Sequence, residues 1–154
     1  MQMHFHISQI WSPITVNDIF KIEQVQKKFT KRLFGLSNYT YFQRLKILNL
    51  DSLELRRLRS DLTLLYKIIF GRAGIESKNF IAMQNRQLRQ LRSHNYQIKP
   101  LHKFHAVRSD RNLFCRTTSI WNNLPTDTNF TSTKSFIKSI PNSHLVKYCK
   151  WNFS

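Results

Sequence analysis

Residues 51–71 read DSLELRRLRSDLTLLYKIIFG, and this stretch decides the fold class. Its apolar side chains recur at steps of three and four residues, the spacing of one face of an amphipathic α-helix. They are Leu55, Leu58, Leu62, Leu65 and Ile69. We expect Asp51, with Glu54 three residues later, to cap the start of this helix, and Gly71 to end it. The spacing lasts barely two heptads, too short for a coiled coil, so we expect the helix to pack within its own chain.

A second amphipathic pattern precedes this helix. Thr15 and Asp18 form a Ser/Thr-x-x-Asp/Glu capping signal, and apolar residues follow at helical spacing up to Gly35. These apolar residues are Ile19, Ile22, Val25, Phe29 and Leu33. We expect this stripe to face the core and four basic residues, Lys27, Lys28, Lys31 and Arg32, to lie on the opposite side. A shorter helix is expected from about Tyr41 to Leu48.

The pattern changes after Gly71. Residues 72–91 are polar, with fading periodicity, and predict a long connection or a weak helix. Residues 94–106 contain Pro100, which cannot donate to a central ladder, and predict extended chain with an edge hairpin. Ser109 or Asp110 is expected to cap a helix that Pro125 ends, and a last short helix is expected over about 132–140. The apolar side of the helix before Pro125 comprises Leu113, Phe114, Thr117, Ile120, Trp121 and Leu124.

Together these patterns predict a mainly α fold. We expect a small helical domain of about five helices, with a short extended or β-hairpin segment near residues 94–106. Along the chain we expect an N-terminal helical part (1–71), a polar connection (72–91), and an extended segment with two C-terminal helices (92–154). Hydrophobic residues make up 41% of the 154 residues, which is enough for one core without disulfide staples.

The charge of the chain favours a polyanionic partner. Lys and Arg number 25 against 8 Asp and Glu, so the formal net charge is +17, and such a field attracts nucleic acid, RNA or DNA alike. Arg86, Arg89 and Arg92 recur at every third residue and would form a cationic stripe on a helix. The full set of expected nucleic-acid-binding residues is Lys27, Lys28, Lys31, Arg32, Arg56, Arg57, Arg59, Arg86, Arg89, Arg92, Arg111 and Arg116.

No catalytic residue, metal site or cofactor is expected. Two-metal chemistry needs clustered carboxylates, and the 8 acidic residues never occur as neighbours in the sequence. Three glycines are too few for a Gly-rich phosphate loop. Zinc ligation and a metal-assisted nuclease are the weaker alternatives. The residue types that could bind zinc fit no compact finger spacing, so packed or exposed histidines and free thiols are expected at His94, His102, His105, Cys115 and Cys149.

The chain shows no sign of a membrane or secretory segment. No run approaches about 18 apolar residues, and the first residues lack the basic start and apolar stretch of a signal peptide. We therefore expect no membrane partner, and an intracellular location, cytoplasmic or nuclear.

The order of several landmarks resembles a known family. In chain order they are IWSP at 10–13, IEQVQKKFTKRL at 22–33, Gly35-Leu36, residues 41–45, LNLDSLELRRLRSDL at 48–62, YKI at 66–68, RSH at 92–94, residues 111–116, IWNNLP at 120–125 and Phe136. This order resembles the region after the polymerase domain in non-LTR (LINE-type, jockey/CR1/RTE-like) retrotransposon reverse transcriptases.

The resemblance implies a helical C-terminal extension that helps to hold template RNA, target DNA or the polymerase domain itself, without a catalytic role. The family's aromatic-x-Asp-Asp turn and its fingers and palm are missing, and Ser93 stands where the family has glycine. We therefore expect a separated tail, encoded by a truncated copy of a transposable element, with at most electrostatic binding of RNA or DNA. The alternative is a packing module for the polymerase thumb with no independent function.

Overall fold

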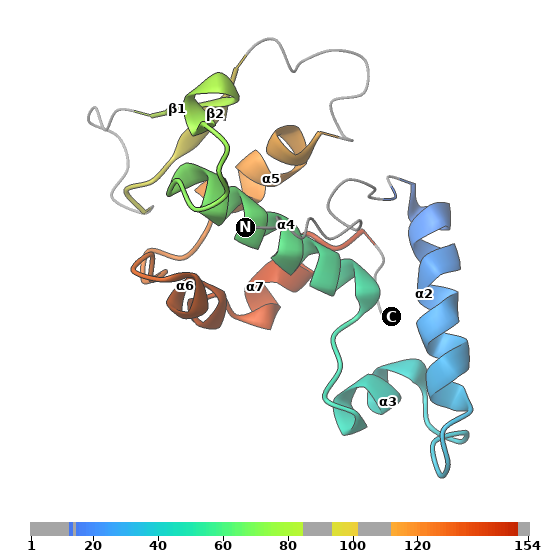
Figure 1. Cartoon of the computed structure of the whole chain (residues 1–154). Helices are drawn as coiled ribbons and strands as arrows, with labels where there is room; N and C mark the ends of the chain where they lie inside the picture. The colour runs from blue at the N-terminus through green and yellow to red at the C-terminus, as the bar shows by residue number, and fades with distance from the viewer. Residues whose placement is uncertain (1–12, 14, 85–93, 102–111, 151–154) are drawn as a thin grey trace.

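The protein is described by a computed structural model that covers residue 13 and residues 15–84, 94–101 and 112–150. The described residues form six α-helices and one two-stranded antiparallel hairpin, which confirms the predicted mainly α fold. In chain order they are α2 (Val16–Lys31), α3 (Tyr41–Ile47), α4 (Leu53–Ile69), β1 (Ile81–Met83), β2 (Ile98–Pro100), α5 (Leu113–Asn122), α6 (Thr133–Ser139) and α7 (Asn142–Val146), with a 3-10 turn, η1 (Ser77–Asn79), before β1 (Figure 1).

Helix α4 is the centre of the fold. Helices α2, α5, α6 and α7 all contact it, and the predicted apolar stripe faces inward, with Leu55, Leu62 and Leu65 buried. The predicted cap is wrong by one residue: the Ser52 hydroxyl accepts the N–H of Leu55 at 3.2 Å. Asp51 instead contacts Arg59 and Asn142.

The main core lies between α4 and the C-terminal half of the chain. Trp121 on α5, Phe136 on α6 and Leu145 on α7 are fully buried there, and the Trp121 indole N–H donates to the Tyr96 carbonyl at 2.6 Å. The predicted apolar side of α5 is confirmed. Its cap is Asn112, whose side chain accepts the N–H of Phe114, whereas Ser109 and Asp110 lie outside the described residues. Helix α7, which follows Pro141, was not predicted.

The hairpin joins two parts of the chain that the sequence separates. Strand β1 lies within residues 72–91, where a connection or weak helix was predicted, and it pairs antiparallel with β2. Each strand is three residues long, too short to show the alternation by which strands are recognised. Ile81 and Ile98 are both buried in the core, so burial holds the pair in place. Pro100 is the last residue of β2, at the end of the ladder.

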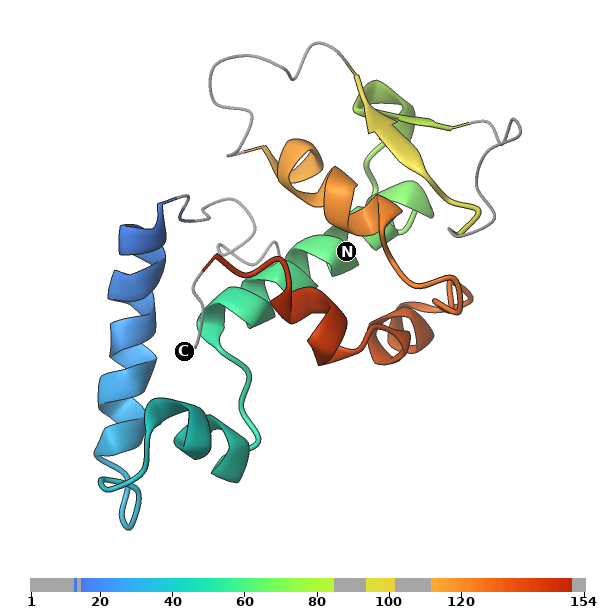
Figure 2. The ribbon, with the colours of Figure 1, turned by 180° about the vertical axis from the view of Figure 1, so that it is seen from behind.

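Helix α2 buries a more polar face than the one predicted: of the predicted stripe Ile19 is buried and Ile22 and Leu33 are half-buried. The predicted apolar stripe is wrong for Val25 and Phe29, which are largely exposed, and the buried residues are Ile19, Glu23, Gln26 and Thr30. In both views α2 stands to one side of the molecule, with α3 at its lower end and the hairpin far away (Figures 1 and 2). The helix begins as predicted, since the Thr15 hydroxyl accepts the N–H of Asp18 at 3.1 Å.

Among the described residues, no helix is both long enough and apolar enough to cross a membrane.

Candidate nucleic-acid interface

A buried carboxylate fixes α2 against the two helices that follow it. The Glu23 carboxylate accepts the hydroxyl of Tyr41, on α3, at 2.5 Å and the N–H of Leu53, the first residue of α4, at 3.1 Å to each oxygen. The N-terminus of α4 stabilises this negative charge through its dipole and its free N–H groups. Burial, together with Glu23 as hydrogen-bond partner, raises the pKa of Tyr41. Glu23 therefore joins α2, α3 and α4 at one point.

A buried guanidinium fixes the C-terminal end of α2. Arg44 on α3 donates from Nε to the Thr30 hydroxyl at 3.1 Å, from Nη2 to the Lys27 carbonyl at 3.2 Å, and from Nη1 to the Tyr39 carbonyl. A cation is favourable at this end of a helix, where the last carbonyls lack intrahelical partners. The end of α2 and the turn that follows it are thus bound to α3.

The outer face of α2 collects basic side chains. Because Glu23, Gln26 and Thr30 point inward, the predicted residues Lys27, Lys28, Lys31 and Arg32 are exposed. Lys21 is also exposed and lies seven residues, or about two turns, before Lys28, so it shares a side of the helix with it. Lys21 is not among the predicted residues, although its spacing from Lys28 identifies it. We call these five residues the basic face of α2.

No exposed carboxylate lies between positions 19 and 50, and the nearest acid before this stretch is the partly exposed Asp18, three residues before Lys21 on α2. Glu23 is the only acidic residue between positions 19 and 50, and its side chain is fully buried. Its charge is compensated by hydrogen bonds inside the protein and not by the lysines of the basic face. The surface of α2 and α3 over these positions is therefore of one sign.

The three predicted arginines of α4 have different surroundings. Arg56 is exposed. Arg57 is half-buried, burial lowers the pKa of its guanidinium, and its Nη2 has no hydrogen-bond partner among the described residues. Arg56 is therefore the one of these three that the structure leaves on the surface of the described chain.

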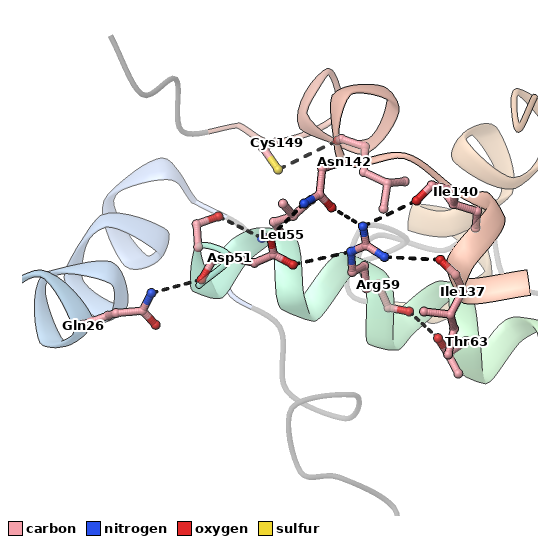
Figure 3. Close-up of polar contacts among 11 residues, drawn as sticks. Gln26, Asp51, Leu55, Arg59, Thr63, Ile137, Ile140, Asn142 and Cys149 are labelled. Atoms are coloured by element: carbon pink, nitrogen blue, oxygen red, sulfur yellow. Dashed lines mark hydrogen bonds and ion pairs between the residues drawn. The ribbon is translucent and has the colours of Figure 1, made fainter. Parts of the chain in front are cut away.

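The Arg59 side chain contacts other residues of the protein (Figure 3). It donates to the carbonyls of Ile137 and Ile140, both at 3.4 Å, and to the Asn142 side chain, and its Nε lies 3.6 Å from Asp51. Asn142 also donates to Asp51 at 3.0 Å. The Arg59 side chain thus links the end of α6 and the start of α7 to α4.

Arg116 is also engaged internally. Its Nε and Nη2 each lie 2.8 Å from a carboxylate oxygen of Asp61, and both side chains are largely buried between α4 and α5. Burial raises the pKa of Asp61, although Arg116 opposes this effect. The remaining predicted residues, Arg86, Arg89, Arg92 and Arg111, lie outside the described residues.

Of the residues considered for zinc, His94 and Cys149 are buried and Cys115 is half-buried. His94 is buried, with Nε2 at 2.7 Å from the Trp121 carbonyl, while Nδ1 accepts the N–H of Tyr96 at 3.1 Å. Burial lowers the pKa of His94 and raises that of the Cys149 thiol to about 12. The described parts of the chain contain no group of three or more metal-binding side chains, and His102 and His105 lie outside them.

Large apolar side chains are also exposed on the N-terminal helices. Among the described residues, most of the exposed large hydrophobic side chains belong to α2, α3 and the turns beside them. They are Val16, Phe20, Val25, Phe29, Phe34, Tyr39, Phe42, Ile47 and Leu50. The surface of this part of the molecule is therefore both basic and rich in aromatic rings.

Comparisons with protein-family models, curated proteins and solved structures found no match for this chain. Its function is therefore inferred from its own residues.

Proposed function

We propose that this chain is a non-catalytic nucleic-acid-binding module of the kind found after the polymerase domain of non-LTR retrotransposon reverse transcriptases, and that it binds the phosphates of RNA or DNA. The observation that carries the proposal is the basic face of α2, formed by Lys21, Lys27, Lys28, Lys31 and Arg32. No exposed carboxylate lies between positions 19 and 50 to neutralise it. The sequence resemblance supports the same class of ligand.

The expected binding is electrostatic and salt-dependent. Each phosphate that a lysine or arginine neutralises releases counterions, which lowers the log of the binding constant as the log of the salt concentration rises. If all five residues of the basic face contact phosphates, the slope is about −4.5 on duplex DNA and about −3.5 on a single strand. If instead the phosphates are bound by positive charge spread over the whole surface, substitutions on α2 alone should not change the slope more than substitutions elsewhere.

A filter-binding series between about 50 and 200 mM KCl tests the proposal. We expect the wild-type chain to lose affinity steeply, and the variant Lys28→Gln/Arg32→Gln to reduce the slope by about 2. The control Lys134→Gln/Lys138→Gln removes two exposed charges from α6 and keeps the same net charge as the test variant. Affinity that stays flat with salt, or an equal effect of both variants, contradicts the proposal.

The lack of catalysis is part of the proposal, supported by what the acidic residues contact. Glu23 and Asp61 are buried in hydrogen bonds that join helices, and Asp51 contacts Arg59 and Asn142. Two divalent ions held about 4 Å apart need free carboxylates between them. Incubation with labelled nucleic acid and Mg²⁺ or Mn²⁺, beside an EDTA control, should give neither cleavage nor primer extension.

A second candidate function is packing against a polymerase thumb, in a larger protein. The exposed apolar side chains of α2 and α3, such as Val25 and Ile47, favour it, because large exposed apolar patches mark interaction surfaces. In that case the isolated chain binds ANS and melts without a cooperative transition. A sharp transition together with monomeric elution contradicts this candidate.

A further inference from the structure

We infer that the C-terminal end of α2 is a site for single-stranded nucleic acid, where Phe29 and Phe34 stack on unpaired bases while Lys28, Lys31 and Arg32 contact the phosphates. This inference deepens the proposed function and rests on it. The five residues form a short stretch of sequence in which rings and cations alternate, and we call them the basic-aromatic end of α2.

The rings of Phe29 and Phe34 are both exposed to solvent. Phe29 lies in the last turns of α2 with 63% of its surface exposed, and Phe34, in the turn after the helix, is completely exposed. The three basic side chains between and beside them are exposed as well. Phe29 and Arg32 are three residues apart and so share a side of the helix, and Phe34 follows Arg32 by two residues in the turn. A strand held at Arg32 would therefore have an exposed ring before it and another after it along the chain.

The fold fixes the backbone that carries these side chains. Thr30, between Phe29 and Lys31, is fully buried and accepts a hydrogen bond from Arg44, which also binds the Lys27 carbonyl. Beyond Phe34, Leu36 is buried and its N–H donates to the Leu33 carbonyl at 3.1 Å. A backbone held in this way loses little conformational freedom when a ligand binds, which favours affinity.

The turn itself depends on a glycine. Gly35 has a φ of +76°, in the left-handed region that side chains disfavour, and it lies between the exposed Phe34 and the buried Leu36. The reversal at Gly35 lets Leu36 enter the protein while Phe34 stays outside. The exposure of Phe34 is therefore a product of the backbone path.

Aromatic rings beside cations favour a single strand over a duplex. In a duplex the faces of the bases are covered by their neighbours, so cations alone can act on it, whereas unpaired bases offer their faces to Phe, Tyr or Trp. A stacked base contributes about 5- to 150-fold in affinity, largely independent of its identity. An acidic lipid surface would also meet cations and apolar side chains, but it does not require a ring, since leucine serves on the apolar face of an interfacial helix as phenylalanine does.

The test compares the full-length chain on two fluorescein-labelled probes, a 20-nucleotide oligo(dT) strand and a 20-base-pair duplex, by fluorescence anisotropy at one salt concentration. We expect tighter binding of the single strand. Phe29→Leu and Phe34→Leu keep an apolar side chain and lose the ring, so each should weaken oligo(dT) binding by about 5-fold or more and leave duplex binding within about 2-fold. Both positions are exposed, so the variants should melt as the wild type does.

The control variant is Val25→Ala. Val25 is on the same helix as Phe29, one turn earlier, with a similar exposed fraction of 68%, but it has no ring, so its loss should leave both affinities unchanged. Binding of the same variants to vesicles of phosphatidylcholine with phosphatidylserine is measured as well, to test an acidic lipid surface as the ligand.

The outcomes separate the inference from the proposed function. If neither oligonucleotide binds, both fail. If both bind with steep salt dependence and the leucine variants match the wild type on oligo(dT), the inference is overturned and the proposed function stands. If Val25→Ala reduces vesicle binding, the leucine variants bind vesicles as the wild type does, and no variant alters oligo(dT) binding, the surface serves a membrane and the inference is overturned.

Discussion

Asp61 and Arg116 form a two-pronged ion pair between α4 and α5, with Nε and Nη2 each 2.8 Å from a carboxylate oxygen. Both side chains are largely buried, so neither charge has much access to water. A buried pair of this kind adds little net stability, because desolvation offsets the attraction, yet removal of one partner leaves an uncompensated charge.

We therefore expect Arg116→Ala to lower the free energy of unfolding by about 3–5 kcal/mol, measured by urea denaturation. The double variant Asp61→Leu/Arg116→Met, which replaces both charges by apolar groups, should recover most of this loss. An effect of Arg116→Ala as small as that of Arg56→Ala, an exposed arginine on α4, would contradict the buried pair.

The stability of the protein should fall as the pH drops below about 6.5. Burial lowers the pKa of His94, so the unfolded chain binds the proton more strongly than the folded chain. The stabilising contribution is complete above the unfolded pKa of about 6.5 and is lost as the pH falls through the folded pKa. Protonation of Nδ1 also removes the acceptor for the Tyr96 N–H.

Thermal melting at pH 7.5 and 5.5 measures this effect. The difference between the two pH values should shrink in His94→Gln. Burial and the neighbouring Lys147 also lower the pKa of His144, so His144→Gln should reduce the difference as well, and the double variant should reduce it further than either single variant. An unchanged difference in His94→Gln would assign the pH dependence to other groups.

The attachment of α2 should fail before the main core does. Glu23→Ala leaves the Leu53 N–H and the Tyr41 hydroxyl without their buried acceptor, at a cost of about 1–3 kcal/mol. Because α2 is outside the main core cluster, amide hydrogen exchange should accelerate in α2 while α5 keeps its protection. Tyr41→Phe, which removes the hydroxyl alone, should have a smaller effect. Equal acceleration in α2 and α5 would show that the two parts open together.

The substitutions Arg59→Ala and Arg56→Ala should differ in their effect on stability. Arg59→Ala removes the bonds to α6 and Asn142 and should lower the free energy of unfolding by about 1–3 kcal/mol, since it leaves carbonyls without donors. Arg56→Ala should leave stability nearly unchanged, because that side chain is exposed. Urea denaturation of the two variants distinguishes them, and an equal loss in both would contradict the different surroundings assigned here.

Phe136 and Ile137 are neighbours on α6 with opposite exposure. Phe136 is fully buried and its ring stacks on Tyr66, with centroids 4.6 Å apart, so Phe136→Ala should cost about 3–5 kcal/mol. Ile137 is exposed, and Ile137→Ala should cost far less. Urea denaturation followed by circular dichroism gives the loss in free energy of unfolding for both variants. Similar losses would contradict the burial of Phe136 in the main core.

The sequence predicts those helices whose buried side is apolar. Leucines recur at helical spacing in α4, and Phe114, Ile120 and Trp121 form the apolar side of α5. In both helices the predicted side faces the core. In these helices the hydrophobic effect alone selects the inward face, and hydrophobicity is readable from residue types.

The predicted stripe of α2 is wrong at Val25 and Phe29 because polar partners decide the buried face of this helix. Glu23 and Thr30 are buried at the expense of Val25 and Phe29 since Tyr41, Leu53 and Arg44 supply hydrogen bonds to them. These partners come from other helices, so no pattern within α2 shows them. The same limit applies to the candidate site. The sequence does not distinguish an arginine that binds a carbonyl or a carboxylate inside the protein, such as Arg59 or Arg116, from an arginine that is exposed to solvent.

The position of Glu23 has a kinetic consequence. A ligand that approaches α2 has no surface ion pair to displace between positions 19 and 50, because the single acid of that stretch is already engaged inside the protein. Capture should then be limited by diffusion and long-range attraction, so association rate constants should rise steeply as ionic strength falls, while dissociation responds much less.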